Sequence, residues 1–314
     1  MKTPILLIAC TFTLLLCGCS RPSLPPSSSV KTPDEARQRV TRWAYWLQHP
    51  DLSALAEYPA DLVVIDYSYD GTDAGAFTRD SIRMLQEAGK KVLCYFSIGE
   101  AETYRFYWNQ SWGKTPPSFL GLENPDWPGN YKVRYWQPQW IKQALEPYMD
   151  RILEAGFDGV YLDIIDAYWY WHETEDISVR KTADDMVSLV ADIARYMRGR
   201  HGKNFIICPQ NALGIINDAS PKYKKLYLDT IDMVGVESLF FNIYSLQDQQ
   251  YRLGLLKEFH RHNIPTLNIE YINNSQYAEY LNKLAAACFQ IIPYPAAPDA
   301  ALDSLTPADW RRKK

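Results

Sequence analysis

The feature that most constrains the fold is a regular alternation of short apolar runs with longer amphipathic segments along most of the chain. The apolar runs are rich in Val, Ile and aromatic residues, which favour strands. The segments between several of them have helical periodicity, and Thr78 can cap one such helix, which ends near Gly89. We expect eight strands, at residues 43–48, 61–67, 91–100, 159–165, 204–211, 232–241, 265–271 and 290–296.

Strands that alternate with helices pair in parallel, with the helices outside the sheet. Eight such units predict an α/β protein with a single-domain (β/α)8 TIM barrel. A doubly wound open sheet is the competing architecture, and it usually carries a Gly-rich phosphate loop after its first strand. No such loop follows the first strand here. We expect the segment from Ala101 to about Gln137 to be a long loop that forms one wall of a cleft.

The two ends of the chain differ from this repeating part. Residues 1–18 resemble a bacterial lipoprotein signal peptide, which predicts cleavage before Cys19 and lipidation of Cys19. An uncleaved membrane anchor is the alternative, although the apolar run is short for a spanning helix. Residues 19–41 are rich in Pro and Ser and read as a tether, residues 42–300 as the barrel and 301–314 as a C-terminal tail. Because Ser20 is not the aspartate associated with inner-membrane retention, we expect an exported protein anchored in the outer membrane.

Composition narrows the classes of partner. The net charge is -4, and no long basic run precedes the C-terminal residues, so nucleic acid is not an expected partner. The cysteines outside the signal segment are too scattered for a disulfide framework or a metal cluster, so we expect buried free thiols at Cys94, Cys208 and Cys288. We expect a monomer that needs neither a metal nor another cofactor.

A barrel places its active site at the carboxyl ends of its strands. Acids and amides gather at these ends, and few lysines or arginines stand near them in the sequence. Each acid taken alone could be a strand cap or half of an ion pair, but an unpaired acidic cluster is costly unless it has a function. The strand-end residues are Asp66, Tyr67, Ser97, Glu100, Asp163, Asp166, Gln210, Asn211, Glu237, Asn268, Glu270, Tyr271 and Tyr294.

Two carboxylates on facing strands suit glycoside hydrolysis, in which one donates a proton and the other attacks the anomeric carbon or activates water. The residues alone do not say which carboxylate has which role. Aromatic residues 168–171 follow the fourth strand, and Trp169 is either a stacking platform for a sugar or a cover for the barrel mouth. No G-x-S-x-G motif supports a serine hydrolase.

Six segments in order carry a family resemblance: KVLCYFSIGEAE, NPDWPGN with VRYWQPQW, GFDGVYLDIIDAY, QNALGII, VGVESLF and TLNIEY. Together they resemble glycoside hydrolase family 114, the endo-α-1,4-polygalactosaminidase-like barrels, whose relatives were once labelled cysteinyl-tRNA-synthetase-like. The resemblance covers about Trp43 to Pro295. It implies a retaining enzyme acting on an α-linked, galactosamine-containing polysaccharide, with Asp163 as nucleophile and Glu237 as general acid/base.

The resemblance also implies substrate contacts, which we expect from Asp66, Tyr95, Asp166, Asn211, Glu270 and, as a sugar platform, Trp169. One departure concerns the fourth strand, where Tyr161, Leu162, Ile164 and Ile165 replace the pattern GVEPDNVD that better-characterised members tend to have. The bulky Tyr161 therefore suggests a reshaped sugar subsite. A non-catalytic carbohydrate-binding lipoprotein on the same barrel is the alternative function.

Overall fold

The computed structural model of the protein describes residues 40–312. The expected signal peptide, Cys19 and nearly all of the tether lie outside the described residues. No helix in the described part is both long enough and apolar enough to cross a membrane. The described part contains the eight expected parallel strands, which are β1(Trp43–Tyr45), β2(Leu62–Ile65), β3(Lys91–Ser97), β7(Gly159–Asp163), β8(Ile206–Pro209), β9(Val234–Glu237), β10(Thr266–Tyr271) and β11(Ile291–Ala296).

The strands are arranged as a barrel. Ladders of parallel pairs join β1-β2-β3-β7-β8 and β9-β10-β11. A parallel bridge between Gln210 and Gly235 connects β8 to β9. At the other seam the indole N–H of Trp43 donates to the carbonyl oxygen of Ile292 at 2.9 Å, which ties β1 to β11. The chain therefore has the (β/α)8 architecture that the alternation predicts.

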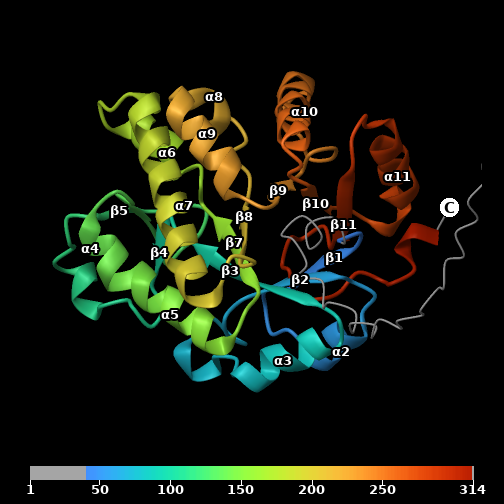
Figure 1. Ribbon diagram of the computed structural model, residues 1–314, viewed down its shortest axis with the longest axis horizontal. Coiled ribbons are helices and arrows are strands. Elements are labelled where there is room, and N and C mark those ends of the chain that lie inside the picture. Colours follow the sequence, from blue (N-terminus) through green and yellow to red (C-terminus); the bar gives the residue numbers. More distant parts are fainter. Residues whose placement is uncertain (1–39, 313–314) are drawn as a thin grey trace, which may run out of the picture.

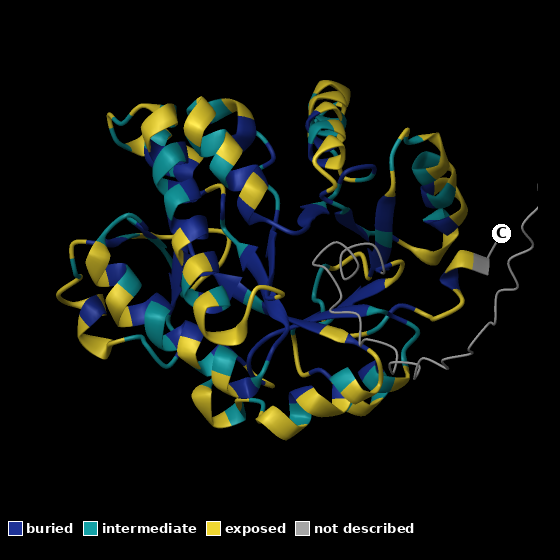
Figure 2. Ribbon diagram, viewed as in Figure 1, coloured by how far each residue is buried: buried dark blue, intermediate teal, exposed yellow. Residues whose placement is uncertain are grey.

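Helices surround the strands in chain order, and Figure 1 shows them passing from the lower edge of the view through the left side and the top to the right. Their outward faces are exposed while the strands at the centre are buried (Figure 2). The helices are α2(Leu52–Glu57), α3(Arg79–Glu87), α4(Pro138–Trp140), α5(Glu146–Ala155), α6(Ala167–Thr174), α7(Val179–His201), α8(Ile215–Asp218), α9(Pro221–Thr230), α10(Leu246–Arg261) and α11(Tyr277–Ala286). The sequence pattern does not predict α2, α6, α8 or α9.

Local signals set the helix ends. The Thr78 hydroxyl accepts the N–H of Ser81 at 3.2 Å and caps α3, as expected. Gly89 follows α3 at φ 82°, a conformation that glycine adopts without strain. Between α4 and α5 the turn Ile141–Leu145 is π-helical, and it directly precedes the helix that contains Pro147. Proline has no N–H for a regular helical bond, which accounts for the irregular turn.

The expectation of a loop at 101–137 is wrong in one respect, because this segment contains most of a second sheet. Antiparallel strands β4(Glu100–Glu102), β5(Leu120–Glu123) and β6(Asn130–Val133) pair in the order β4-β6-β5. Only two residues separate β4 from the end of β3, so the sheet stands directly on the rim of the barrel. We call it the rim sheet.

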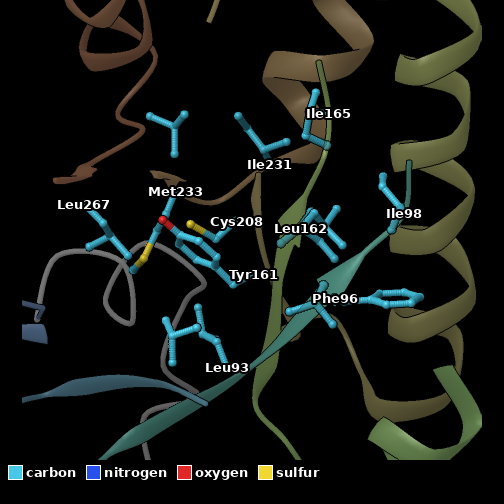
Figure 3. Close-up of a cluster of buried hydrophobic side chains, with 14 of the residues drawn as sticks. Leu93, Phe96, Ile98, Tyr161, Leu162, Ile165, Cys208, Ile231, Met233 and Leu267 are labelled. Carbon is cyan, nitrogen blue, oxygen red and sulfur yellow. The ribbon is translucent and has the colours of Figure 1, made fainter. Parts of the chain in front are cut away.

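Aromatic side chains fill the barrel interior. The rings of Trp43, Tyr45 and Tyr161 pack together, with Tyr45 and Tyr161 centroids 5.3 Å apart. Figure 3 shows Tyr161 beside Cys208 and Met233, while Phe96 points the opposite way. Gly235 makes room for the Tyr161 hydroxyl, since a Cβ there would lie 2.1 Å from that oxygen.

This position corrects the interpretation of Tyr161. It is fully buried in the barrel interior, so it does not line an open sugar subsite. The side chain alternates with its neighbours along β7, and Asp163 two residues later shares its inward direction but sits at the rim.

Two further expectations need correction. Cys94 and Cys208 are buried free thiols, but Cys288 is exposed. The segment after residue 300 is part of the fold rather than a free tail, because the Leu302 carbonyl accepts the backbone N–H of Leu47 at 2.8 Å. Trp310 is also buried, and its ring stacks on Tyr280.

Candidate active site

The first candidate side chain is Asp163, the last residue of β7. It is partly buried, and its Oδ2 accepts the hydroxyl of Tyr95 at 2.6 Å. In the register of β3 and β7, Tyr95 pairs with Tyr161, and Ser97 pairs with Asp163. Tyr95 therefore lies one inward-facing layer below Asp163, and its side chain extends up to the carboxylate. The strand pairing thus fixes both ends of this hydrogen bond.

Glu237 is the last residue of β9 and is held by two donors. The Tyr271 hydroxyl lies 2.6 Å from Oε1, and Nδ2 of Asn211 lies 3.0 Å from Oε2. The side-chain oxygen of Asn211 also accepts the backbone N–H of Glu237 at 3.0 Å. A single amide therefore fixes both the main chain and the carboxylate of Glu237.

The two carboxyl groups influence each other. Burial and then the nearby Glu237 carboxylate raise the pKa of Asp163 to about 7, against the opposing hydrogen bond from Tyr95. Two carboxylates that interact in this way resist being charged together, so one proton is retained near neutral pH. Such a pair can supply both an acid and a base.

The chain turns sharply at the rim. Ile164, Asn211, Ala212 and Ser238 all have φ between 47° and 61°, immediately after three of the barrel strands. Such a φ is costly for a β-branched residue such as Ile164 and is typical of functional sites. These turns end the strands earlier than expected: the sixth strand ends at Glu237 rather than at 241.

Gly99 makes the turn at Ile164 feasible. A Cβ at position 99 would lie 2.3 Å from the Ile164 carbonyl oxygen and 2.7 Å from its Cγ2. The rim sheet begins at the next residue, so this close contact joins the rim sheet to the turn that follows Asp163.

Asp166 is exposed at the barrel mouth, just before α6. Lys132 and Glu100 of the rim sheet and Glu237 all contribute to the electrostatic field at Asp166. Lys132 lies 2.5 Å from Oε1 of Glu100, and the second oxygen of that buried Glu100 has no hydrogen-bond partner among the described residues. The expectation that few cations pair with these acids therefore needs correction at Glu100, because Lys132 of the rim sheet forms an ion pair with it.

Asp66 does not have the free carboxylate that we expected. It is buried, and Arg105 donates to Oδ1 at 2.8 Å and to Oδ2 at 2.7 Å. The same guanidinium contacts Glu102 through Nε at 2.5 Å. Both oxygens of Asp66 are used by a permanent cation, so we remove Asp66 from the candidate substrate contacts.

Glu270 also departs from the expectation. It is fully buried, and its carboxylate accepts the backbone N–H groups of Leu239 at 2.8 Å, Phe240 at 2.9 Å and Phe241 at 3.2 Å. It supports the segment that follows Glu237 and has no access to a substrate. We correct its role from substrate contact to support of the rim.

Tyr271, the neighbour of Glu270, is the residue of this strand whose side chain contacts Glu237. Side chains alternate along a strand, so of these two neighbours one reaches the Glu237 carboxylate and the other points outward. That parity is the sequence signal that identifies Tyr271, which we noted as a strand-end residue without giving it a role.

The aromatic block beyond β7 divides into two parts. Trp171 is buried, and its indole donates to the Val133 carbonyl oxygen at 2.7 Å, so it anchors α6 to the rim sheet. Trp169 remains 44% exposed, with its ring near His172. An exposed indole at this point is available for stacking, whereas Trp171 covers the core.

An open cavity of about 450 Å³ adjoins Glu237. Its lining residues are Asp166, Asn211, Ala212, Leu213, Gly214, Glu237, Ser238, Asp248, Tyr251, Arg252 and Leu255. Within residues 40–312 no group of three His, Cys, Asp or Glu side chains is placed to hold a metal ion. The arrangement provides a rigid pair of carboxyl groups beside a polar cavity.

Known proteins resemble this chain in fold. The glycoside hydrolase domain of PelA from Pseudomonas aeruginosa has a TM-score of 0.64 at 16% identity, covering 86% of this chain and 98% of that domain. Aspergillus fumigatus Ega3, solved as a complex with galactosamine, has a TM-score of 0.57 at 24% identity and covers 82% and 92%. Both likenesses support the (β/α)8 barrel fold.

Sequence comparison gives the family. An uncharacterized protein of Methanocaldococcus jannaschii is 38% identical over 277 residues, which is 84% of this chain and 77% of that protein. An uncharacterized protein of Thermotoga maritima is 35% identical, covering 84% and 82%. The model of glycoside-hydrolase family GH114 matches residues 24–301. The chain therefore belongs to glycoside hydrolase family 114.

Proposed function

We propose that this glycoside hydrolase cleaves an α-linked, galactosamine-containing polysaccharide, with Asp163 as nucleophile and Glu237 as general acid/base. The observation that carries the proposal is the pair itself: two carboxyl groups from β7 and β9, each held by a tyrosine hydroxyl at 2.6 Å, with an electrostatic interaction between them. The family assignment and the galactosamine in the Ega3 complex support the choice of sugar.

Position supports the proposed roles, and so does the resemblance. Glu237 lines the open cavity and Asp163 does not. A general acid must reach the oxygen that joins the sugar to the departing part of the polymer, and the open side of the pair is where that part has room. We therefore assign the attack on the anomeric carbon to Asp163, which does not line the cavity.

The proposed reaction has two steps. Glu237 gives its proton to the glycosidic oxygen while an Asp163 oxygen bonds to the anomeric carbon and the carbon–oxygen bond to the leaving sugar breaks. Water then gives a proton to the Glu237 carboxylate, and its oxygen bonds to the anomeric carbon as the bond to Asp163 breaks. Both side chains return to their starting states, and the anomeric configuration is retained.

In the free enzyme the raised pKa of Asp163 favours the shared proton on the proposed nucleophile. The reaction starts from the form in which the proton is on Glu237 and Asp163 is charged, and the positive charge that develops at the anomeric carbon stabilises the Asp163 carboxylate in the transition state. Tyr95 supports the charged form of Asp163 through its hydroxyl. Asp166, Asn211 and Trp169 complete the proposed substrate contacts.

The direct test is turnover of purified α-linked galactosamine polymers by the full-length protein, with product sizing. Asp163→Asn and Glu237→Gln should each abolish turnover while sugar binding persists. Azide added to the Asp163→Asn variant should yield a glycosyl azide of inverted configuration if Asp163 is the nucleophile. Binding without turnover in the wild type would instead favour a carbohydrate-binding protein.

We also propose that the protein is an exported monomer anchored to the outer membrane through a lipid on Cys19. The support is the signal-like sequence of residues 1–18 and the Pro/Ser-rich segment that follows. Growth with labelled palmitate should label the wild type but not a Cys19→Ser variant, and membrane fractionation should locate it. Light scattering in detergent should give the mass of one chain plus its micelle.

A further inference from the structure

The cavity beside Glu237 extends away from the acid pair toward α10. Its far wall is formed by Asp248, Tyr251 and Arg252, which lie on one side of that helix. Its near wall is the segment from Asn211 to Gly214, which follows β8. A molecule bound between these walls would lie against Glu237 and outside the barrel interior.

The near wall is fixed before any ligand binds. The Asn211 side chain is held by Glu237, and residues 211 and 212 both have left-handed backbone conformations. Behind it, the Tyr168 hydroxyl donates to Asp218 at 2.8 Å. Across the cavity, the Tyr251 ring is 50% exposed, and its hydroxyl accepts Nδ2 of Asn217 at 3.4 Å. A half-exposed ring held at its hydroxyl presents a face for packing without a large loss of entropy.

The cavity lining contains more acidic than basic side chains. The Arg252 guanidinium donates to the carbonyl oxygen of Ser238 at 2.9 Å and to that of Glu237, so its hydrogen bonds are directed at the backbone. Its nearest approach to Asp248 is 3.8 Å, a loose ion pair. Asp166 makes no hydrogen bond to another side chain among the described residues. Three acidic side chains, Asp166, Glu237 and Asp248, thus line the cavity, while its one guanidinium is engaged by main-chain oxygens.

We propose that this cavity is the subsite for the sugar on the leaving side of the cleaved bond, and that it selects an amino sugar with a free ammonium group. Asp248 accepts the ammonium, and the ring packs against Tyr251. The inference rests on the proposed function, because it takes Glu237 as the group that protonates the leaving oxygen. Acetylation of the amine removes the positive charge that the acidic lining favours.

The test uses α-1,4-linked galactosamine oligosaccharides that carry a label at the reducing end, since that end belongs to the leaving fragment. Asp248→Asn should lower kcat/KM by roughly tenfold, the equivalent of one charge-assisted hydrogen bond. Fully N-acetylated oligosaccharides should be cleaved at a rate that this variant does not change. Tyr251→Ala should alter the lengths of the labelled fragments, because a leaving-side contact is lost.

Glu258→Gln is the matched control, because Glu258 lies on the same helix and pairs with Lys224 at 2.7 Å, away from the cavity. An unchanged labelled-fragment pattern in Tyr251→Ala would overturn the leaving-side assignment. Equal losses on free and acetylated oligosaccharides in Asp248→Asn would overturn the ammonium contact.

A calorimetric titration separates this inference from the proposed function. Galactosamine oligosaccharide is titrated into Asp163→Asn and into Asp163→Asn/Asp248→Asn. Binding that is about tenfold weaker in the double variant supports the subsite even if the wild type cleaves none of these polymers, a result that would refute the proposed function alone. Equal affinities refute the subsite.

Discussion

The hydroxyl of Tyr271 lies 2.6 Å from Oε1 of Glu237, and these two residues come from neighbouring strands of the barrel. Their hydrogen bond fixes the direction of the carboxylate. It mirrors the bond between Tyr95 and Asp163 on the other side of the mouth. Each carboxyl group of the pair therefore has its own tyrosine.

Tyr271→Phe should lower kcat by about tenfold to a hundredfold, since a hydrogen bond to a charged group is worth roughly 1.5–3 kcal/mol. The variant removes one oxygen and leaves the ring in place. It should also shift the pH profile, which a purely structural role would not do. Tyr196→Phe is the matched control, because its hydroxyl contacts Asp150 at 2.7 Å at an exposed site. A Tyr271→Phe variant with wild-type kcat and pH profile would contradict this role.

The pH dependence of activity should follow Asp163. Its pKa of about 7 is raised by burial and by Glu237, so the carboxyl group is protonated below that pH in the free enzyme. Catalysis needs one proton and one negative charge on the pair, so kcat/KM should fall as the pH rises above about 7, where the pair loses its shared proton, and should fall again at low pH, where the pair takes up a second proton. Initial rates across pH 4–9 measure this, and a flat profile would argue against the pair.

Asp163→Asn should stabilise the fold at neutral pH while it destroys activity. In the wild type the folded-state pKa is raised, so the stability contributed by the proton is present below the unfolded-state pKa near 3.8 and is lost as the pH rises through about 7. The Asp163→Asn variant does not lose this stability, because asparagine has no titrating proton. The Tm difference between variant and wild type should therefore grow between about pH 4 and pH 7 and then level off. A difference that does not change with pH would show that the group titrates normally.

Gly99→Ala should destabilise the protein by about 1–3 kcal/mol, the usual cost of overpacking. The new methyl group would meet the Ile164 carbonyl oxygen at 2.3 Å and force the turn after Asp163 to move. We therefore expect kcat to fall as well. Gly199→Ala is the control, because it lies inside α7 with nothing near its Cβ position. Urea unfolding and kcat measure the two effects, and a stable, fully active Gly99→Ala would refute the argument.

Asp66→Asn should reduce stability and leave KM unchanged. It leaves the buried Arg105 with a weaker partner just after β2, and breaking a buried ion pair costs about 3–5 kcal/mol. The exposed pair of Lys225 with Asp229 offers a control, because Asp229→Asn should change the Tm little. An increase in KM in Asp66→Asn with an unchanged Tm would restore Asp66 to the substrate contacts.

The amino-acid sequence by itself determined the eight strands and the rim that carries Asp163 and Glu237. Strand periodicity is local, and the carboxyl ends of parallel strands must share one edge of the barrel, so the acids could be placed together without knowing any contact. The rim sheet, by contrast, was read as a loop, because its strands β4, β5 and β6 are short and have no regular apolar alternation.

Only the tertiary structure decided what each acid contacts. Asp66 and Arg105 are 39 residues apart, and Glu270 meets amides about 30 residues away. Such pairs depend on how the turns after the strands fold, and no local pattern encodes that. Packing between segments distant in sequence also fixes three other features. These are the side of the strand on which Glu270 and Tyr271 lie, the burial of Tyr161 inside the barrel and the cavity beside α10.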